Sequence, residues 1–293
     1  MDQPIIDPPR SRPLPINYPG RRDFIIVASD GVRFSLSRAV LATTSSFFAD
    51  MFIVGEPSSS TQSSEEQIVN APENHVVLDS LFAISYSHPE KPAPTIQSFA
   101  RIAELIRVAE KYRMHHALDY LSSQLALPRI QGTTVFQPFT VTHPLATLSL
   151  SLTQGFSLPA RLALKEVVGA TNSIWDTTFD DAALGGFTLD FRVLKKIHRM
   201  RKSRTDAYTG FIQLLNCQQP NVYRVPCTGV QDWKADLLKK FEESPNSAAF
   251  SVEFYKGWTC GRCGQSLVSA NSPAFVTFIT RQAAEERTLP ELR

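Results

Sequence analysis

Residues 23 to 52 constrain the fold more than any other stretch of this chain, because they hold the signals for two strands and two short helices. Three β-branched residues at 25–27 suit a buried strand. Asp30-Gly31 is a pair that two-residue hairpin loops favour, since Gly adopts positive φ without steric cost. Apolar and polar residues alternate over 32–36, which predicts a return strand with one buried face.

The segment after the hairpin predicts two short helices. Ser37 precedes the first of them, and its hydroxyl is predicted to cap the helix by accepting a backbone N–H bond. A small sheet covered by helices therefore opens the chain. We expect the fold class to be α+β.

These elements resemble the opening of a BTB/POZ domain. That family begins with an Asp before a hydrophobic strand and continues after the hairpin with Phe-x-Ala-His-Lys/Arg-x-Val-Leu-Ala, two small residues, Ser, any residue and aromatic-Phe. The positions that match without a gap are Phe34, Arg38, Val40, Leu41, Ala42, Ser45, Phe47 and Phe48. Leu36 stands where the family commonly has Ala, and Ser37 replaces its usual His.

The resemblance continues to about residue 127. After a polar loop at 55–75 we expect a strand at Val76–Leu78 and a helix capped by Asp79. This helix should end near Tyr86, which matches the Tyr of the family's aromatic-Tyr-x-Gly pattern. Apolar residues then recur at helical spacing over 99–112 and 118–125. Residues 108–114 resemble the turn between the last two helices of the family, and Pro128 ends the second helix.

We therefore divide the chain into a proline-rich tail at 1–22, a BTB/POZ domain at 23–127 and a mostly α-helical region at 128–293. The tail contains six prolines and is predicted to be disordered. In the last region, apolar residues at helical spacing predict helices at 145–152, 159–170, 191–201, 207–215 and 233–241. This layout resembles the expanded BTB family of mushroom-forming fungi, whose variants often lack the conserved His.

Composition excludes several classes of protein. The chain has 293 residues, 43% of them hydrophobic, and a net charge of +2, which argues against nucleic acid or an anionic membrane as the main partner. We see neither a signal-peptide core nor the ~18 apolar residues that a membrane helix needs. Four cysteines are too few for a disulfide scaffold, so we expect a cytoplasmic or nuclear protein.

The cysteines predict a structural zinc site as the one candidate cofactor. The pair in Cys260-Gly-Arg-Cys263 has the spacing of two thiolate ligands on one tetrahedral ion, and two further ligands are needed. Cys217 and Cys227 are the candidates to complete the site, with His198 as a weaker one. The alternatives are four free thiols, or a thioredoxin-like redox pair, which only thirty residues after Cys263 leave little room to form.

No catalytic motif is present, so we expect no enzyme. The sequence lacks a Gly-rich phosphate loop, a Gly-x-Ser-x-Gly motif and a paired-carboxylate signature. Basic residues cluster at 195–204, where apolar residues interleave with them at helical spacing. This pattern fits a solvated helix face, and alternatively a nuclear address or a surface that contacts phosphates.

The resemblance implies a protein-binding scaffold that forms a homodimer through its first helix and the neighbouring elements. Apolar residues placed to serve there, or in the domain core, are Val40, Leu41, Phe47, Phe48 and Met51. Some relatives join substrates to cullin-type ubiquitin ligases and carry a hydrophobic-x-Glu motif after the second helix, which Val54-Gly55-Glu56 fits. The alternative function is a transcriptional regulator that uses the C-terminal cysteines and basic run to contact DNA or chromatin.

Overall fold

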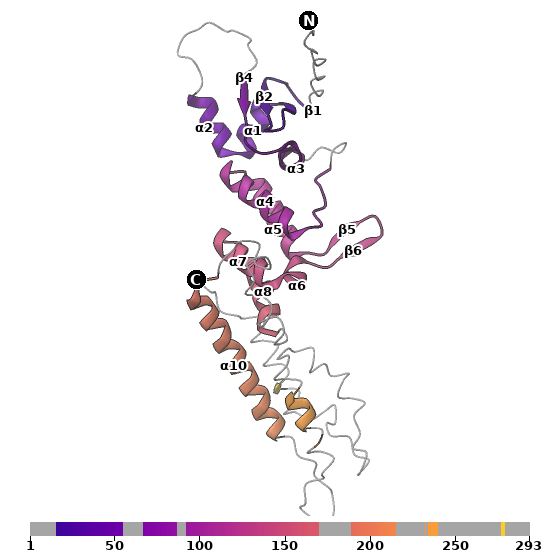
Figure 1. Cartoon of the computed structure of the whole chain (residues 1–293), viewed down its shortest axis with the longest axis vertical. Helices are drawn as coiled ribbons and strands as arrows, with labels where there is room; N and C mark the ends of the chain where they lie inside the picture. The colour runs from indigo at the N-terminus through magenta and orange to yellow at the C-terminus, as the bar shows by residue number, and fades with distance from the viewer. Residues whose placement is uncertain are drawn as a thin grey trace, which may run out of the picture. The chain divides into compact units, whose positions relative to one another are not determined.

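The structure is a computed structural model that describes residues 16–54, 67–86, 92–169, 189–214, 232, 234–239 and 277–278. Its contacts divide the chain into two units, Met1–Phe136 and Gln137–Arg293, and Figure 1 labels helices of both. The first unit combines a small sheet with helices, and the described elements of the second are helical. The fold class is therefore α+β, as the sequence predicts.

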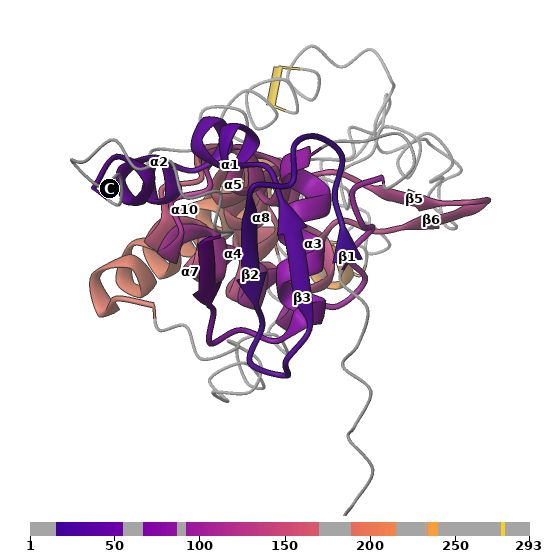
Figure 2. The same ribbon diagram turned by 90° about the horizontal axis from the view of Figure 1, so that it is seen from above.

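The first unit contains a four-stranded sheet in the order β1-β3-β2-β4. The strands are β1 (Ile16–Asn17), β2 (Phe24–Val27), β3 (Arg33–Leu36) and β4 (Gln67–Asn70). The hairpin strands β2 and β3 are antiparallel, whereas β1 joins β3 and β4 joins β2 in parallel. Figure 2 shows β1, β3 and β2 side by side. The alternation over β3 buries one face of this strand, as predicted, and β2 alternates in the same way with Phe24 and Ile26 buried.

The hairpin loop is one residue longer than the sequence predicted. Ala28 N donates to Val32 O at 2.9 Å, which closes the ladder and leaves residues 29–31 as the loop. Gly31 N also donates to Ala28 O at 2.9 Å, and Gly31 has φ +84°. The glycine is thus needed for positive φ as expected, but it follows a turn centred on residues 29 and 30.

The helices of the first unit are α1 (Arg38–Thr44), α2 (Ser46–Val54), α3 (His75–Tyr86), α4 (Phe99–Lys111) and α5 (His115–Ala126). The two short helices after the hairpin and the last pair, with its break at Met114, confirm the prediction. The buried rings of Phe24, Phe34, Phe48 and Phe82 contact one another or neighbouring rings edge to face and form the centre of this core.

The prediction for residues 67–79 was wrong. The strand is β4 at Gln67–Asn70, within the segment expected to be a loop, and Val76–Leu78 belongs to α3. Asn74 starts this helix, since its Oδ1 accepts a hydrogen bond from Val77 N at 3.0 Å. Asp79 consequently lies inside the helix rather than at its cap.

A second, two-stranded sheet follows α5 and was not predicted. Strand β5 (Arg129–Gln131) pairs antiparallel with β6 (Thr134–Phe136), and Gly132 in the loop has φ +59°. The hairpin extends away from the helices of the first unit in both ribbon views (Figures 1 and 2). Arg129 anchors its base, because Arg129 Nη1 donates to Ile96 O at 2.8 Å.

The second unit contains α6 (Phe139–Thr142), α7 (Pro144–Gln154), α8 (Ser157–Gly169) and α10 (Phe191–Leu214). Gly155, with φ +74°, ends α7 and turns the chain into α8. A cluster of Leu, Val, Ala and Ile side chains from α7, α8 and α10 forms the core. The sequence predicted two helices over 191–215, but the structure has the single helix α10.

Candidate protein-interaction surface

Two side chains from other parts of the fold position the start of α1. Asp23 Oδ1 accepts a hydrogen bond from Arg38 N at 2.8 Å, and Tyr86 Oη accepts one from Ser37 N at 2.7 Å. The Ser37 side chain makes no capping bond to the helix. The predicted Ser37 cap was therefore wrong, because Asp23, from the residue before β2, takes that role.

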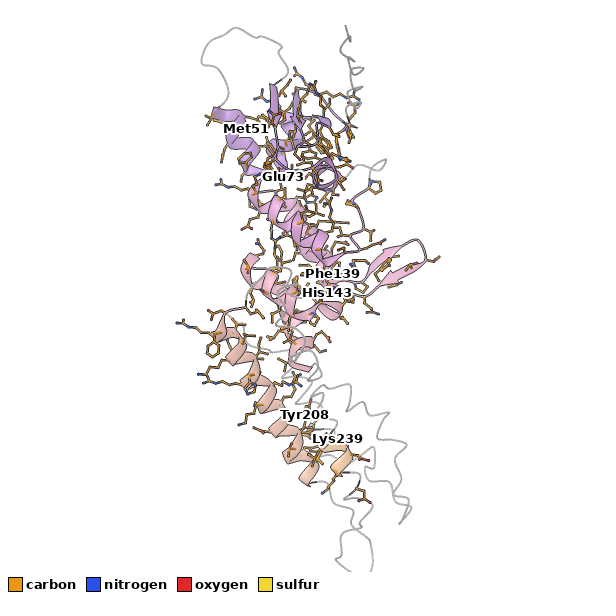
Figure 3. All side chains as sticks on the ribbon, viewed as in Figure 1. Met51, Glu73, Phe139, His143, Tyr208 and Lys239 are labelled. Carbon is orange, nitrogen blue, oxygen red and sulfur yellow. The ribbon has the colours of Figure 1, made fainter. Side chains whose placement is uncertain are left out.

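The residues predicted for a dimer or partner interface divide into buried and accessible ones. Leu41 is 0% exposed and Phe48 is 2% exposed, so both belong to the core of the first unit. Val40 and Met51 are half-buried, and Phe47 is 39% exposed. Figure 3 labels Met51 on α2. The accessible members of the predicted set therefore lie on α1 and α2.

The last turn of α2 has the most exposed apolar side chains of this helix. Ile53 is 75% exposed and Val54 is 86% exposed. An aliphatic residue at such a site loses more water contact on binding a partner than any buried residue of the same helix. Val54 is the first residue of the predicted hydrophobic-x-Glu motif, whereas Glu56 lies outside the described residues.

A cluster of aromatic and charged residues supports α2 from the turn after α4. The Phe48 and Tyr112 rings stack with 5.5 Å between their centroids, and Phe47 meets Tyr112 edge to face at 5.4 Å. Glu73, labelled in Figure 3, accepts hydrogen bonds from Lys111 Nζ at 2.6 Å and from the Tyr112 hydroxyl at 2.5 Å. Burial raises the pKa of the Glu73 carboxyl, but these two bonds outweigh it and the net pKa is lowered.

Strands of the first unit also carry exposed apolar side chains. Ile68 on β4 is exposed beside Ile25 of β2, its partner in the ladder. Ile130 and Val135 face each other across the β5–β6 hairpin and are both exposed. Neither place is evident from the sequence, which predicts no strand in these segments.

All four cysteines lie outside the described residues, so the predicted zinc site stays a prediction. His198, its weaker candidate, is exposed on α10. Among the described residues no group of three or more His, Cys, Asp and Glu is arranged to hold a metal ion. None of the described helices combines the length and apolarity required to cross a membrane.

Adjoining exposed apolar side chains, such as Ile53 and Val54 at the end of α2, are typical of a surface that binds another protein. Residues 20–126 match the family model of the BTB/POZ domain, so this part of the chain is a BTB/POZ domain. Domains of this family are protein–protein interaction modules. None of the curated proteins matches the chain, and the closer resemblance to the fungal family stays a prediction.

Proposed function

We propose that this protein is a non-catalytic adaptor that self-associates through its BTB/POZ domain and recruits a second protein. The observation that carries this proposal is the combination of the family match at residues 20–126 with the exposed apolar end of α2. Self-association uses the accessible residues Val40, Phe47 and Met51. Such an adaptor acts in the cytoplasm or the nucleus.

The partner proposed for the end of α2 is a cullin-type ubiquitin ligase subunit. Val54 supports this assignment, because its side chain is exposed at the final position of the helix and is free to enter an apolar pocket of a partner. Glu56 would follow it as the acidic residue of the motif. A small apolar anchor beside a charge is a common arrangement at protein interfaces.

Sedimentation velocity of the full chain tests the self-association. We expect a dimer at tens of micromolar, on the order of ordinary homodimer affinities. Met51→Asp should shift the chain to a monomer, because a carboxylate in an apolar interface loses hydration without gaining a partner. Val135→Asp introduces the same charge at an exposed residue of the β5–β6 hairpin and is the matched control. A monomeric wild-type chain at this concentration contradicts the proposal.

Co-purification with the N-terminal domain of a cullin tests the partner. Val54→Asp and Glu56→Lys should each abolish capture while leaving the sedimentation of the dimer unchanged. Val135→Asp should retain capture. Loss of self-association in the Val54 variant would show that α2 ends in the dimer interface, and equal capture of all variants would remove the cullin assignment.

A second candidate function is contact with nucleic acid through α10. Arg192, Lys195, Arg199 and Lys202 are exposed, and their spacing of three and four residues places them along one side of the helix. None of the four forms a salt bridge within the described part of the chain. This row supports the proposal that α10 neutralises phosphates in the nucleus.

Fluorescence anisotropy with duplex DNA tests this second function. Four phosphate contacts predict that log K falls with log salt with a slope of about −3 to −4. Lys195→Glu with Lys202→Glu should remove most of the affinity. Arg161→Glu, at an exposed residue of α8, is the control for one reversed charge on the second unit. Absence of binding at low salt eliminates the function.

A further inference from the structure

A cavity of about 190 Å³ lies inside the first unit. Its walls come from the sheet, from α2 and α3 and from the turn between α4 and α5. The residues that define these walls are Ile26, Phe48, Val69, Leu81, Phe82 and Met114. Five of the six, all except Val69, are at most 2% exposed, so the inner wall of the cavity belongs to the domain core.

The lining of this cavity is apolar and aromatic. Its polar lining residues are Asn70, Lys111 and Tyr112, and both Lys111 and the Tyr112 hydroxyl bind the Glu73 carboxylate. With their polar ends bound, Tyr112 and Lys111 offer a ligand their ring and their alkyl chain. A charged ligand entering here would lose its hydration without gaining a partner.

The cavity is larger than the voids of close-packed protein interiors, which seldom exceed a water molecule, because it is open on one side. An apolar cavity of about 150 Å³ produced by truncating a core leucine stays dry and binds benzene. That example comes from another protein, and the space here is larger. We propose that this cavity is a binding site for a small uncharged aromatic molecule, of a size between benzene and indole.

Access to the site is from the side of Phe47. The cavity is incompletely enclosed, and the most exposed of its lining residues are Phe47, Asn70, Pro72 and Lys111, which therefore form the mouth. The Phe47 ring packs edge to face on Tyr112, so an aromatic ligand would meet ring edges and faces in the geometry that aromatic pairs favour. The Met114 thioether adds a polarizable contact with such a ring.

The four methionines of the chain give a direct readout. Full-length protein labelled with ¹³C at the methionine methyl groups is titrated with benzene, and Met114 is assigned with Met114→Leu. We expect the Met114 signal to shift while the signals of Met51 and Met200, which do not line the cavity, stay in place. Benzoate, of similar size but charged, should cause no such shift.

Variants that fill the cavity, compared with one that enlarges a residue outside it, test where benzene binds. Ala71→Leu and Leu78→Phe each enlarge a lining residue and should abolish the benzene-dependent shift of the Met114 signal. Val76→Leu enlarges an exposed residue of α3 that does not line the cavity and should leave binding unchanged. Benzene at ten times its Kd should also increase the folded-to-unfolded ratio of the wild type about 11-fold and raise its melting temperature.

Three outcomes overturn the inference. The first is a wild-type Met114 signal that does not move at millimolar benzene in folded protein. The second is binding that persists undiminished in either folded filling variant, which places the ligand elsewhere. The third is equal binding of benzoate, which excludes an apolar site. Should Ala71→Leu fail to fold, Leu78→Phe and the comparison of benzene with benzoate still decide the question.

Discussion

The carboxylate of Asp23 accepts a hydrogen bond from the backbone N–H of Arg38, with 2.8 Å between Asp23 Oδ1 and Arg38 N. Arg38 is the first residue of α1, so this N–H has no partner within the helix. Asp23 immediately precedes β2, and the bond ties the start of that strand to the start of the helix. A negative charge at this end also interacts favourably with the helix dipole.

Replacing Asp23 with Ala should lower the free energy of unfolding by about 1 kcal/mol, the usual cost of a lost N-cap acceptor. Asp23→Asn keeps an acceptor oxygen and should lose less. Urea denaturation followed by circular dichroism measures both values. Equal stability of wild type and Asp23→Ala would show that water replaces the carboxylate without cost.

The Ser37 prediction shows which information the sequence lacked. Ser37 has the residue type and position of a helix cap, and local pattern alone assigns it that role. The structure assigns the role to Asp23, 15 residues from Arg38, and pairs the Ser37 N–H with the Tyr86 hydroxyl. Local propensity cannot reveal such contacts. Ser37→Ala should consequently destabilise the protein less than Asp23→Ala.

The reach of local sequence patterns also explains which other elements of the first unit are predicted correctly. Strong periodicity correctly predicted α4 and α5, and the alternation at 32–36 correctly predicted the buried face of β3. The β-branched Val76 and Val77 favour a strand, but the burial of Val77 and the Asn74 cap outweigh this propensity in the folded protein. For the candidate interface, adjacent Phe47 and Phe48 look alike in sequence, and only packing distinguishes the exposed ring from the buried one.

High pH should destabilise the first unit through Tyr86. Burial raises the pKa of Tyr86 to about 12, above its ordinary value of about 10. The folded state therefore holds this proton more tightly than the unfolded state, and its contribution to stability is complete below about pH 10 and is lost as the pH rises from 10 to 12. Melting temperatures should fall across this range, since burial also raises the pKa of Tyr18 and Tyr112.

In Tyr86→Phe the melting temperature should fall less between pH 10 and 12 than in the wild type, because the variant lacks one of the titrating phenols. Its melting temperature at pH 8 provides the baseline, where the lost bond to Ser37 N already lowers stability by about 1 kcal/mol. If the melting temperatures of wild type and variant fall equally steeply between pH 10 and 11.5, Tyr86 does not contribute to the alkaline loss of stability.

Glu73 should make the first unit sensitive to acid. Despite burial, the bonds from Lys111 and Tyr112 hold the pKa of Glu73 below its ordinary value. Its contribution to stability is therefore complete above about pH 4.5 and is lost as the pH falls through the lower, folded-state value. Glu73→Gln should be less stable at pH 7 and lose less stability between pH 5 and 3, as measured by urea denaturation at each pH.

Glu104→Gln is the matched control, because it removes one carboxylate from an ion pair with Arg101 on α4, in which the Glu104 side chain is 47% exposed. A carboxylate so accessible to solvent contributes little to stability, so this variant should follow the wild type at every pH. If both variants lose less stability than the wild type between pH 5 and 3, the cause is a general effect of charge and not the local contacts of Glu73.

The second unit is expected to bind zinc through four cysteines, Cys217, Cys227, Cys260 and Cys263. If the four thiolates share one ion with zinc–sulfur bonds of about 2.3 Å, the site is structural, because no coordination position remains for water. Protein purified without chelator should then contain about one zinc per chain. Cys263→Ser should lower the zinc content and destabilise the second unit, since the free energy of metal binding is part of its folding free energy.

The first unit provides the control within the same molecule. No cysteine precedes Cys217, so the zinc-depleted variant should keep the Met114 signal and the urea transition of the first unit unchanged. Metal analysis and the two transitions together separate the alternatives. Zinc-free wild type that unfolds like Cys263→Ser would mean that the cysteines are free thiols, and simultaneous loss of both transitions would mean that the two units fold as one.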